Sequence, residues 1–409
     1  MRTVNATATA VTAALAVAAA GVAVGRLAAD AALKAAPGRP LPTEPRLTVH
    51  GTAAGQITLT RDLATLRPGR YGLTGNGTHA IVGPVLPDAE HTADTVVRRL
   101  ERVTRGTLEP GDRAWLTPSV HIGDPGTALG LDHTDVEVRG ELGALPAWFV
   151  PGSRDTWIIA VHGLGTTREH TLNVMGFLHR HHFPVLALAY RGDAGAPRPP
   201  DGLGHLGETE WHDLDAAIHH AVRSGARRVV LHGWSTGATM ALRAAARSEL
   251  RDLVSGLVLD SPVLHWETTL RALAAARRTP SVLLPLAVRA AQGRMKASPQ
   301  HHTGTSGTPG TTGTTGTTET PRAPETPGAT GASGTARPAT APEGPRIPTL
   351  VVHGPDDRVA PWQLSRRLAD AGPGPVTLHT VRNAPHGAMW NADPDAYEEV
   401  LRRFLTPLV

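Results

Sequence analysis

The stretch of sequence that decides the fold is RVVLHGWSTG, at residues 228–237. The apolar run at 228–232 predicts a buried strand, and the Ala-rich segment Thr236–Ser248 predicts the helix that follows it. A G-x-S-x-G sequence between a strand and a helix is typical of a sharp turn that exposes its serine, here Ser235. The two flanking glycines have a steric reason, because a Cβ at either position would crowd the neighbouring strand or helix.

Strands and helices alternate on both sides of this turn. The predicted strands are Thr156–Val161, Pro184–Ala189, Arg228–His232, Leu253–Leu259, Thr349–Val352 and Val376–Thr380, and the predicted helices are Thr167–His181, Glu210–Ser224, Thr236–Ser248, Trp362–Ala371 and Asp395–Phe404. Short strands that alternate with helices form right-handed βαβ units, which predicts an α/β fold with a mostly parallel sheet and helices on both faces. Val136–Val138 and Ala147–Val150 predict an antiparallel pair at its beginning.

The part of the chain before this pattern has a different character. Residues 26–45 are rich in Ala and Pro and predict a linker. Residues 46–131 contain short apolar runs separated by Gly, Pro and Asp, which predict a small β-rich accessory domain without a catalytic motif. Within it, Thr92–Val103 is a helical candidate.

Two further segments interrupt the α/β pattern. Residues 264–297 predict two amphipathic helices joined near Pro280, which we expect to form a small cap with an apolar inner face. Residues 299–346 are dominated by Thr, Gly, Pro and Ala, and this composition predicts a disordered insertion.

The N-terminus has a pattern that favours a targeting signal or an anchor. No residue between Arg2 and Arg26 is charged, and residues 13–24 are wholly apolar or glycine. A cationic start, an apolar run and an exit of small residues are typical of a signal peptide. Residues 3–25 also reach spanning length, although Ala and Thr make them only marginally hydrophobic. We expect residues 1–25 to be a signal peptide or a membrane anchor, which makes the protein secreted or membrane-anchored. An Ala-rich soluble helix is the alternative.

Composition excludes several function classes. The chain has 409 residues, a formal net charge of +4 and no cysteine, so disulfides and thiolate metal sites are ruled out. No basic stripe interleaved with aromatic residues is present, which argues against a nucleic-acid partner. His179, His181 and His182 crowd a predicted helix end, but their spacing and the lack of a supporting carboxylate favour a solvated terminus over a metal site. The sequence predicts neither a metal nor a cofactor.

Four motifs at predicted strand ends resemble those of the α/β-hydrolase superfamily, over roughly residues 133–409 apart from the insertion. They are HGLG at 162–165, GWSTG at 233–237, HGPDDRV at 353–359 and PHG at 385–387. Their order (serine, acid, histidine) is the one that this fold uses. The sequence is most similar to the serine aminopeptidase and prolyl-oligopeptidase-like branch. The resemblance implies an α/β-hydrolase domain at residues 132–409.

The resemblance also implies a catalytic triad of Ser235, Asp357 and His386. Serine needs a base, and His386 takes its proton and returns it to the leaving group, while a carboxylate fixes the tautomer of the histidine. The family pattern places the acid three residues after a glycine, which selects Asp357. Asp356, beside it, and Asp260, at a strand end where some relatives carry their acid, remain alternatives.

Other residues of these motifs have expected supporting roles. The backbone N–H groups of Thr236 and Leu164 are the expected oxyanion donors. Thr166 and Glu169 form a capping-box pattern at the start of the next helix. The resemblance implies that Tyr190–Asp193 lines the pocket without taking part in the reaction.

These observations predict a serine hydrolase that cleaves an ester or amide through an acyl-serine intermediate, without a cofactor. A serine at the elbow separates the chain from branches of this fold that use aspartate there. We expect a carboxylesterase-like activity on a small-molecule ester, because no acidic clamp for a substrate amine is identified. A peptidase of the prolyl-oligopeptidase-like type, acting on a peptide-like substrate, is the first alternative. A membrane-tethered binding protein on a hydrolase scaffold that no longer catalyses is the second.

Overall fold

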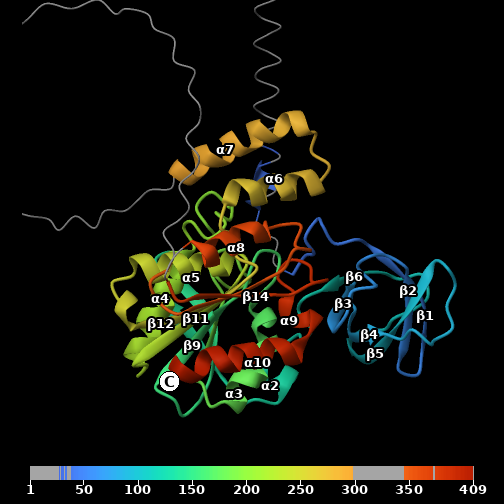
Figure 1. Cartoon of the computed structure of the whole chain (residues 1–409), viewed down its shortest axis with the longest axis horizontal. Coiled ribbons are helices and arrows are strands. Elements are labelled where there is room, and N and C mark those ends of the chain that lie inside the picture. The colour runs from blue at the N-terminus through green and yellow to red at the C-terminus, as the bar shows by residue number, and fades with distance from the viewer. Residues whose placement is uncertain are drawn as a thin grey trace, which may run out of the picture.

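The structure, a computed structural model, describes residues 27, 29–31, 33, 34, 38–297, 345–371 and 374–408. The expected signal peptide or anchor at residues 1–25 and nearly all of the expected insertion at 299–346 lie outside these residues. No helix within the described ranges is long and apolar enough to cross a membrane. Figure 1 shows two bodies side by side, a small β-barrel near the N-terminus and a larger α/β domain.

The α/β domain is built on an eight-stranded sheet in the order β14-β13-β12-β11-β9-β10-β8-β7. Its strands are β7 (Thr134–Arg139), β8 (Ala144–Val150), β9 (Thr156–Val161), β10 (Val185–Leu188), β11 (Arg228–Trp234), β12 (Val254–Asp260), β13 (Thr349–His353) and β14 (Val376–Thr380). From β10 to β14 all neighbours pair in parallel, while β8 is antiparallel to both β10 and β7. The predicted parallel sheet and the antiparallel pair at its beginning are confirmed.

Helices cover both faces of this sheet. They are α2 (Pro125–Leu129), α3 (Leu172–Arg180), α4 (Trp211–Arg223), α5 (Thr236–Arg247), α8 (Trp362–Asp370), α9 (Met389–Ala392) and α10 (Pro394–Leu405). Apolar residues of α3 and α10 pack on one face, and those of α4, α5 and α8 pack on the other. Strands buried on both faces explain the continuous apolar run of β9, in which all six residues are buried. The helix predicted at Thr167–His181 begins as a 3₁₀ turn at Arg168–Thr171.

The N-terminal body is a closed six-stranded antiparallel barrel in the order β1-β2-β5-β4-β3-β6. Its strands are β1 (Leu47–Ala53), β2 (Gln56–Thr60), β3 (Tyr71–Gly75), β4 (His79–Val85), β5 (Thr95–Arg105) and β6 (Arg113–Thr117). Closure leaves no strand edge of the barrel without a partner, since β1 pairs with β6. The predicted β-rich domain is therefore a barrel.

The helix predicted at Thr92–Val103 is wrong. From Thr95 onward these residues belong to β5, which pairs with β2 along one side and with β4 along the other. Both neighbours satisfy the backbone of β5, and β-branched residues such as Val96 and Val97 fit its pleated, buried surface. The pairing partners lie outside the local window, so the local pattern does not reveal them.

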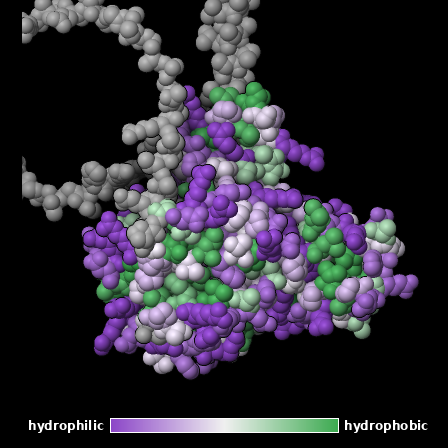
Figure 2. All heavy atoms as spheres, viewed as in Figure 1, coloured by the Kyte–Doolittle hydropathy of each residue, from purple (hydrophilic) through white to green (hydrophobic). Residues whose placement is uncertain are grey.

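Two helices lie over the α/β domain as the predicted cap: α6 (Trp266–Ala276) and α7 (Leu284–Ala297), joined by a short turn at Ser281–Leu283 (Figure 1). Their inner residues form an apolar cluster with Leu203 and Leu206. The face shown in Figure 2 is mostly hydrophilic, with hydrophobic residues reaching the surface over the barrel and at the cap.

Residues 26–45, predicted as a linker that precedes the β-rich domain, also take part in packing. Ala29 and Leu33 are fully buried in the cap cluster, and Lys34 forms a β-bridge with Leu203. Burial of these apolar side chains against the cap explains why this part of the segment is ordered.

Candidate active site

Ser235 occupies the sharp turn between β11 and α5. Its backbone has φ +53° and ψ −113°, a strained combination for a residue with a side chain, and its N–H donates to the Asp260 carbonyl oxygen at 2.8 Å. The flanking glycines allow this turn. A Cβ on Gly233 would lie 2.4 Å from the Gly237 backbone, and one on Gly237 would lie 2.3 Å from the carbonyl oxygen of Val161. Strain of this kind concentrates at functional sites.

Ser235, His386 and Asp357 form one hydrogen-bonded chain. The Ser235 Oγ lies 2.6 Å from His386 Nε2, and His386 Nδ1 lies 2.6 Å from Asp357 Oδ2. Ser235 follows β11, Asp357 follows β13, and His386 follows β14, so the ends of parallel strands at one edge of the sheet bring together residues far apart in the sequence. The three side chains are largely buried, which strengthens electrostatic interactions among them.

Every oxygen of the Asp357 carboxylate has donors. Oδ2 also lies 2.9 Å from His353 Nε2, and Oδ1 accepts the backbone N–H groups of Val359 and Ala360 at 2.7 and 2.9 Å. Burial raises the pKa of this carboxyl, but His386 and the hydrogen bonds from both histidines outweigh burial and hold the pKa well below its usual range. Asp357 is therefore a stable anion.

The two alternative acids lie outside this chain. Asp356 is exposed, and its Oδ2 accepts the N–H of Asn383 at 2.7 Å. Asp260 is fully buried at the end of β12, where Oδ1 accepts the Ser261 hydroxyl at 2.8 Å. Burial raises the pKa of Asp260 to about 7, against weaker opposing effects of Ser261 and His386. No hydrogen bond joins either carboxyl to His386 in the described part of the chain.

The two expected oxyanion donors lie next to the serine. Thr236 begins α5, so its N–H has no acceptor within the helix. The loop that holds Leu164 presses against the elbow, because a Cβ on Gly163 would lie 2.6 Å from the Ser235 Cβ. Both Leu164 and Thr236 lack a hydrogen-bond acceptor for their N–H among the described residues. The N–H groups are therefore available to a ligand beside Ser235.

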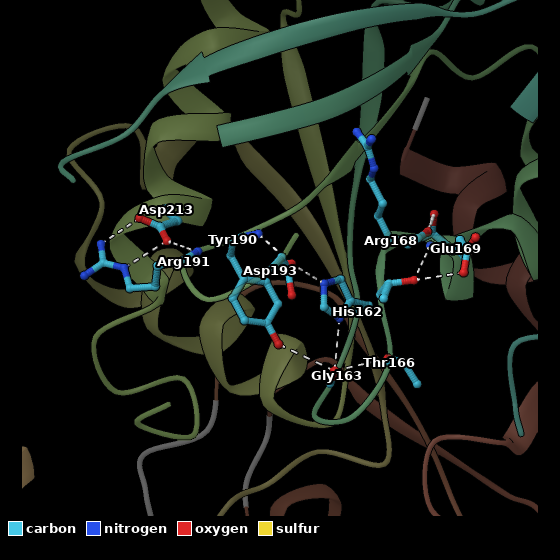
Figure 3. Close-up of polar contacts among 11 residues, drawn as sticks. His162, Gly163, Thr166, Arg168, Glu169, Tyr190, Arg191, Asp193 and Asp213 are labelled. Carbon is cyan, nitrogen blue, oxygen red and sulfur yellow. Dashed lines mark hydrogen bonds and ion pairs between the residues drawn. The ribbon is translucent and has the colours of Figure 1, made fainter. Parts of the chain in front are cut away.

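A polar network holds the loop before Leu164 in place (Figure 3). His162 Nε2 lies 2.7 Å from Asp193 Oδ2, and the same carboxylate oxygen accepts the Tyr190 N–H at 2.9 Å. The ring of Tyr190 stacks on that of His162 with centroids 4.6 Å apart. The segment Tyr190–Asp193 thus supports the loop that carries the expected oxyanion donor Leu164.

Arg191 anchors this supporting segment to α4. Its guanidinium forms two hydrogen bonds with Asp213, at 2.9 and 2.6 Å, and its backbone N–H adds a third at 2.8 Å (Figure 3). Both side chains are buried, and such a bidentate pair fixes geometry as well as charge. No motif singled out this pair in the sequence.

The capping residue after the oxyanion loop differs from the prediction. Thr167, not Thr166, is the N-cap of the 3₁₀ turn and accepts the Glu169 N–H at 3.3 Å. The Thr166 hydroxyl instead donates to the Gly163 carbonyl oxygen at 3.1 Å, and Glu169 reaches the Gly123 N–H. The 3₁₀ start of the helix shifts the cap by one residue.

A pocket that is partly open to solvent is lined by Ser235 and His386. Its floor comes from the α/β domain and includes Trp234 and His170, which is fully buried and whose pKa burial lowers to about 3. The opposite side of the pocket comes from the N-terminal part of the chain, which sequence reasoning left outside the site. The residues there are Arg39, Pro40, Leu41, Glu44, Arg67, Tyr71, Leu116, Thr117 and Pro118.

Comparisons with solved structures show the same fold. The chain is similar to the esterase Pf2001 of Pyrococcus furiosus, with 19% identity and a TM-score of 0.50 over 70% of this chain and 95% of that one. It is also similar to a Thermogutta terrifontis esterase, with 16% identity and a TM-score of 0.43 over 67% and 99% of the two chains. Est1E of Butyrivibrio proteoclasticus has 15% identity and a TM-score of 0.45 over 67% and 98%.

Two family models match the sequence, whereas no curated protein sequence does. Residues 48–117, the barrel, match a domain of unknown function (DUF8805). Residues 158–400 match the alpha/beta hydrolase family, and this range is more than half of the chain and contains all four motifs. The chain belongs to the alpha/beta hydrolase family.

Proposed function

We propose that the protein is a serine hydrolase that cleaves a carboxylic ester through an acyl-serine intermediate. The observation that carries the proposal is the hydrogen-bonded chain from Ser235 Oγ through His386 to Asp357, with both links at 2.6 Å. A serine is a weak nucleophile unless a base takes its proton, and this chain supplies a base already oriented by an anion.

In this reaction His386 takes the Ser235 proton as Oγ attacks the ester carbonyl carbon. The carbonyl oxygen becomes an oxyanion, which accepts hydrogen bonds from the N–H groups of Leu164 and Thr236. His386 then protonates the departing alcohol, which leaves an acyl-serine. Water attacks the acyl group with His386 as the base again, and the acid product and free Ser235 result.

An ester is favoured over a peptide because of the charges around the pocket. Glu44 is its one acidic side chain among the described residues, and its Oε2 is paired with Arg67 at 2.7 Å. A peptidase that holds a free substrate amine needs an available anion there. The solved esterases named above share the fold, and the assignment of ester chemistry to this chain is our own.

The experiment is labelling by a fluorophosphonate probe together with turnover of p-nitrophenyl acyl esters and of a matched peptide p-nitroanilide panel. We expect labelling and ester turnover in the native protein, and neither in Ser235→Ala. The Ser235→Ala, His386→Ala double variant should be little worse than either single one, because triad members act as a unit. Full activity in a correctly folded Ser235→Ala variant would contradict the proposal. Cleavage of the peptide substrates faster than of the esters by the native protein would favour the peptidase alternative.

We also propose that residues 1–25 direct the protein to the membrane or out of the cell. Support comes from the uncharged run between Arg2 and Arg26. Cell fractionation with an antibody against the barrel tests this. Protein found wholly in the cytosol with its first residues intact would contradict it.

A further inference from the structure

The barrel is held against the α/β domain by two asparagines that bind its backbone. Asn391, in α9, donates from Nδ2 to the carbonyl oxygens of Arg70 and Pro118 at 2.8 and 2.9 Å, and its backbone carbonyl oxygen accepts the Arg70 N–H at 2.8 Å. Asn173, in α3, donates to the same Pro118 oxygen at 2.8 Å and accepts the Val120 N–H at 3.2 Å. Both asparagines are buried. The contacts fix two barrel segments, 67–71 and 116–120, beside the catalytic domain.

A buried arginine inside the barrel fixes the first of these segments from the other side. Arg98 is fully buried and donates to four backbone carbonyl oxygens, those of Thr65, Arg67, Gly69 and Gly83, at 2.7 to 3.0 Å. A buried guanidinium is costly unless its donors are satisfied, so these bonds hold the loop tightly. The loop that carries Arg67 and leads into Tyr71 is thus pinned on both sides.

These two segments are the ones that border the catalytic pocket. Arg67 and Tyr71 come from the first, and Leu116–Pro118 come from the second. The contacts that dock the barrel therefore also set the wall that faces Ser235. If the barrel only stabilised the catalytic domain, the segments that dock it would not need to line the pocket beside Ser235.

The barrel wall carries unused hydrogen-bonding groups. The Tyr71 hydroxyl is buried and has no hydrogen-bond partner among the described residues. Burial raises the pKa of Tyr71 to about 12, so the hydroxyl is neutral and can donate. One N–H of Arg67 donates to Glu44. The other N–H groups of its guanidinium have no acceptor in the part of the chain that the structure describes. Arg67 and Glu44 are only partly buried.

We propose that the barrel is the specificity wall of the active site, where Arg67 and Tyr71 bind an uncharged oxygen of the substrate, such as an ether, hydroxyl or carbonyl oxygen. The inference rests on the proposed ester hydrolysis and names its substrate class: esters with an oxygen-bearing group beyond the scissile bond. An ester with only hydrocarbon in that position leaves the Tyr71 hydroxyl unpaired, and buried polar groups left unpaired are the strongest source of discrimination in binding sites.

The test compares ester pairs in which one CH₂ is replaced by an ether oxygen, so that size and shape stay nearly constant. Suitable p-nitrophenyl pairs are butyrate with methoxyacetate, pentanoate with 3-methoxypropanoate, and hexanoate with 4-methoxybutanoate, and a matching series varies the alcohol side. The quantity measured is the ratio of kcat/KM for the ether to kcat/KM for the alkyl ester. It is measured in the native protein, in Tyr71→Phe and in Arg67→Met.

Arg70→Met is the matched control. Arg70 lies three residues from Arg67 on the same segment and pairs with Glu101 at 2.7 Å, away from the pocket lining. We expect Tyr71→Phe and Arg67→Met to lower the ether preference about tenfold in at least one pair, and Arg70→Met to leave it unchanged. Because the Tyr71 hydroxyl has no hydrogen-bond partner among the residues that the structure describes, Tyr71→Phe should also unfold at the same or a higher temperature.

The outcomes separate this inference from the function on which it rests. Ester turnover that depends on Ser235 but has the same ether preference in all four proteins overturns the barrel's role and leaves the hydrolase intact. A drop in the melting temperature of Tyr71→Phe without a change in preference overturns it too, because the hydroxyl is then structural. Absence of turnover that depends on Ser235 overturns both proposals.

Discussion

His353 bonds the same oxygen of Asp357 that faces His386: its Nε2 lies 2.9 Å from Asp357 Oδ2. The other ring nitrogen of His353, Nδ1, lies 2.8 Å from the Ser365 hydroxyl, and the His353 side chain is completely buried. Because the Asp357 carboxylate can only accept a hydrogen bond, His353 donates to it from Nε2. The carboxylate is thus held in orientation by a histidine that does not contact the serine.

His353→Phe tests this positioning role. An aromatic ring is kept, although phenyl is larger than imidazole, and the donor is lost, so we expect kcat to fall on the order of tenfold with KM nearly unchanged, and the free energy of unfolding to fall by about 2 kcal/mol. Ester turnover and denaturant unfolding measure the two effects. Ser365→Ala, which leaves the Nε2 donor in place, is the control and should keep most of kcat. Equal losses in both variants would indicate a packing role only.

The identity of the triad acid is tested by three Asp→Asn changes. Asp357→Asn supplies the wrong hydrogen-bond partner to His386 and should lower kcat on the order of 10⁴. Asp356→Asn and Asp260→Asn should cost much less, since neither carboxyl contacts His386. Circular dichroism checks the fold of each variant. If Asp260→Asn lost most of its kcat while Asp357→Asn lost little, Asp260, at the end of β12, would be the acid.

Asp260 should make stability depend on pH in an unusual direction. Burial raises its pKa to about 7 in the folded protein, above the ordinary aspartate value of 3.8. The folded state therefore holds a proton that the unfolded state releases. The resulting stability is fully present below about pH 4 and is lost as the pH rises through 7. A shift of this size corresponds to about 4 kcal/mol.

Asp260→Asn mimics the protonated acid at every pH. We expect this variant and the native protein to have similar free energies of unfolding at pH 5, with the variant more stable at pH 8, as measured in urea. Asp252→Asn, at an exposed position, is the control and should show no such crossover. A difference that does not change with pH would mean that Asp260 is ionised in the folded protein.

Asp193 is expected to act on the oxyanion loop through His162. Asp193→Asn weakens the 2.7 Å contact to Nε2, so the loop before Leu164 loses its support. We expect kcat to fall about 10²-fold with a small change in KM, because oxyanion contacts form mainly in the transition state. Asp201→Asn breaks a similar contact to His205, at 3.0 Å, outside the loop, and should retain activity. An equal loss of kcat in Asp193→Asn and Asp201→Asn would show that Asp193 has no special role in positioning the loop.

Gly69 tests the docking of the barrel. It has φ +83°, and a Cβ there would lie 1.9 Å from the Asn391 carbonyl oxygen. Gly77 has a similar φ of +73° with open space around it. Both Gly→Ala variants should lose about 1 kcal/mol through the left-handed backbone. Only Gly69→Ala should lose several times more and also lose ester turnover. Equal effects, measured by urea unfolding and a p-nitrophenyl assay, would show that the contact tolerates displacement.

The sequence predicts the catalytic domain well because its signals are local. Continuous apolar runs mark strands buried on both faces, and each chemical motif lies at the end of such a run, as GWSTG does after β11. The acid position is less local. Asp356, Asp357 and Asp260 are all carboxyls near strand ends, and only the family pattern separates them before the geometry is known.

The role of the barrel wall is not visible in the sequence for a physical reason. Arg67 and Tyr71 belong to no motif, and the bond that places them joins Arg70 to Asn391, 321 residues further along the chain. The misassigned helix at Thr92–Val103 has a similar origin, since its strand partners are β2 and β4. Long-range pairing can override local preference.

The short stretch from His386 to Asn391 joins the two halves of the molecule. His386 contacts Ser235, and Asn391, five positions later, forms hydrogen bonds with the barrel backbone. Domains fused in one chain are often interchangeable modules, shuffled freely over evolution. Here the proposed general base and the residue that binds the neighbouring domain lie five positions apart, so a change in one domain is transmitted to the other through this stretch. Grafting this barrel onto another hydrolase would require transplanting that stretch as well.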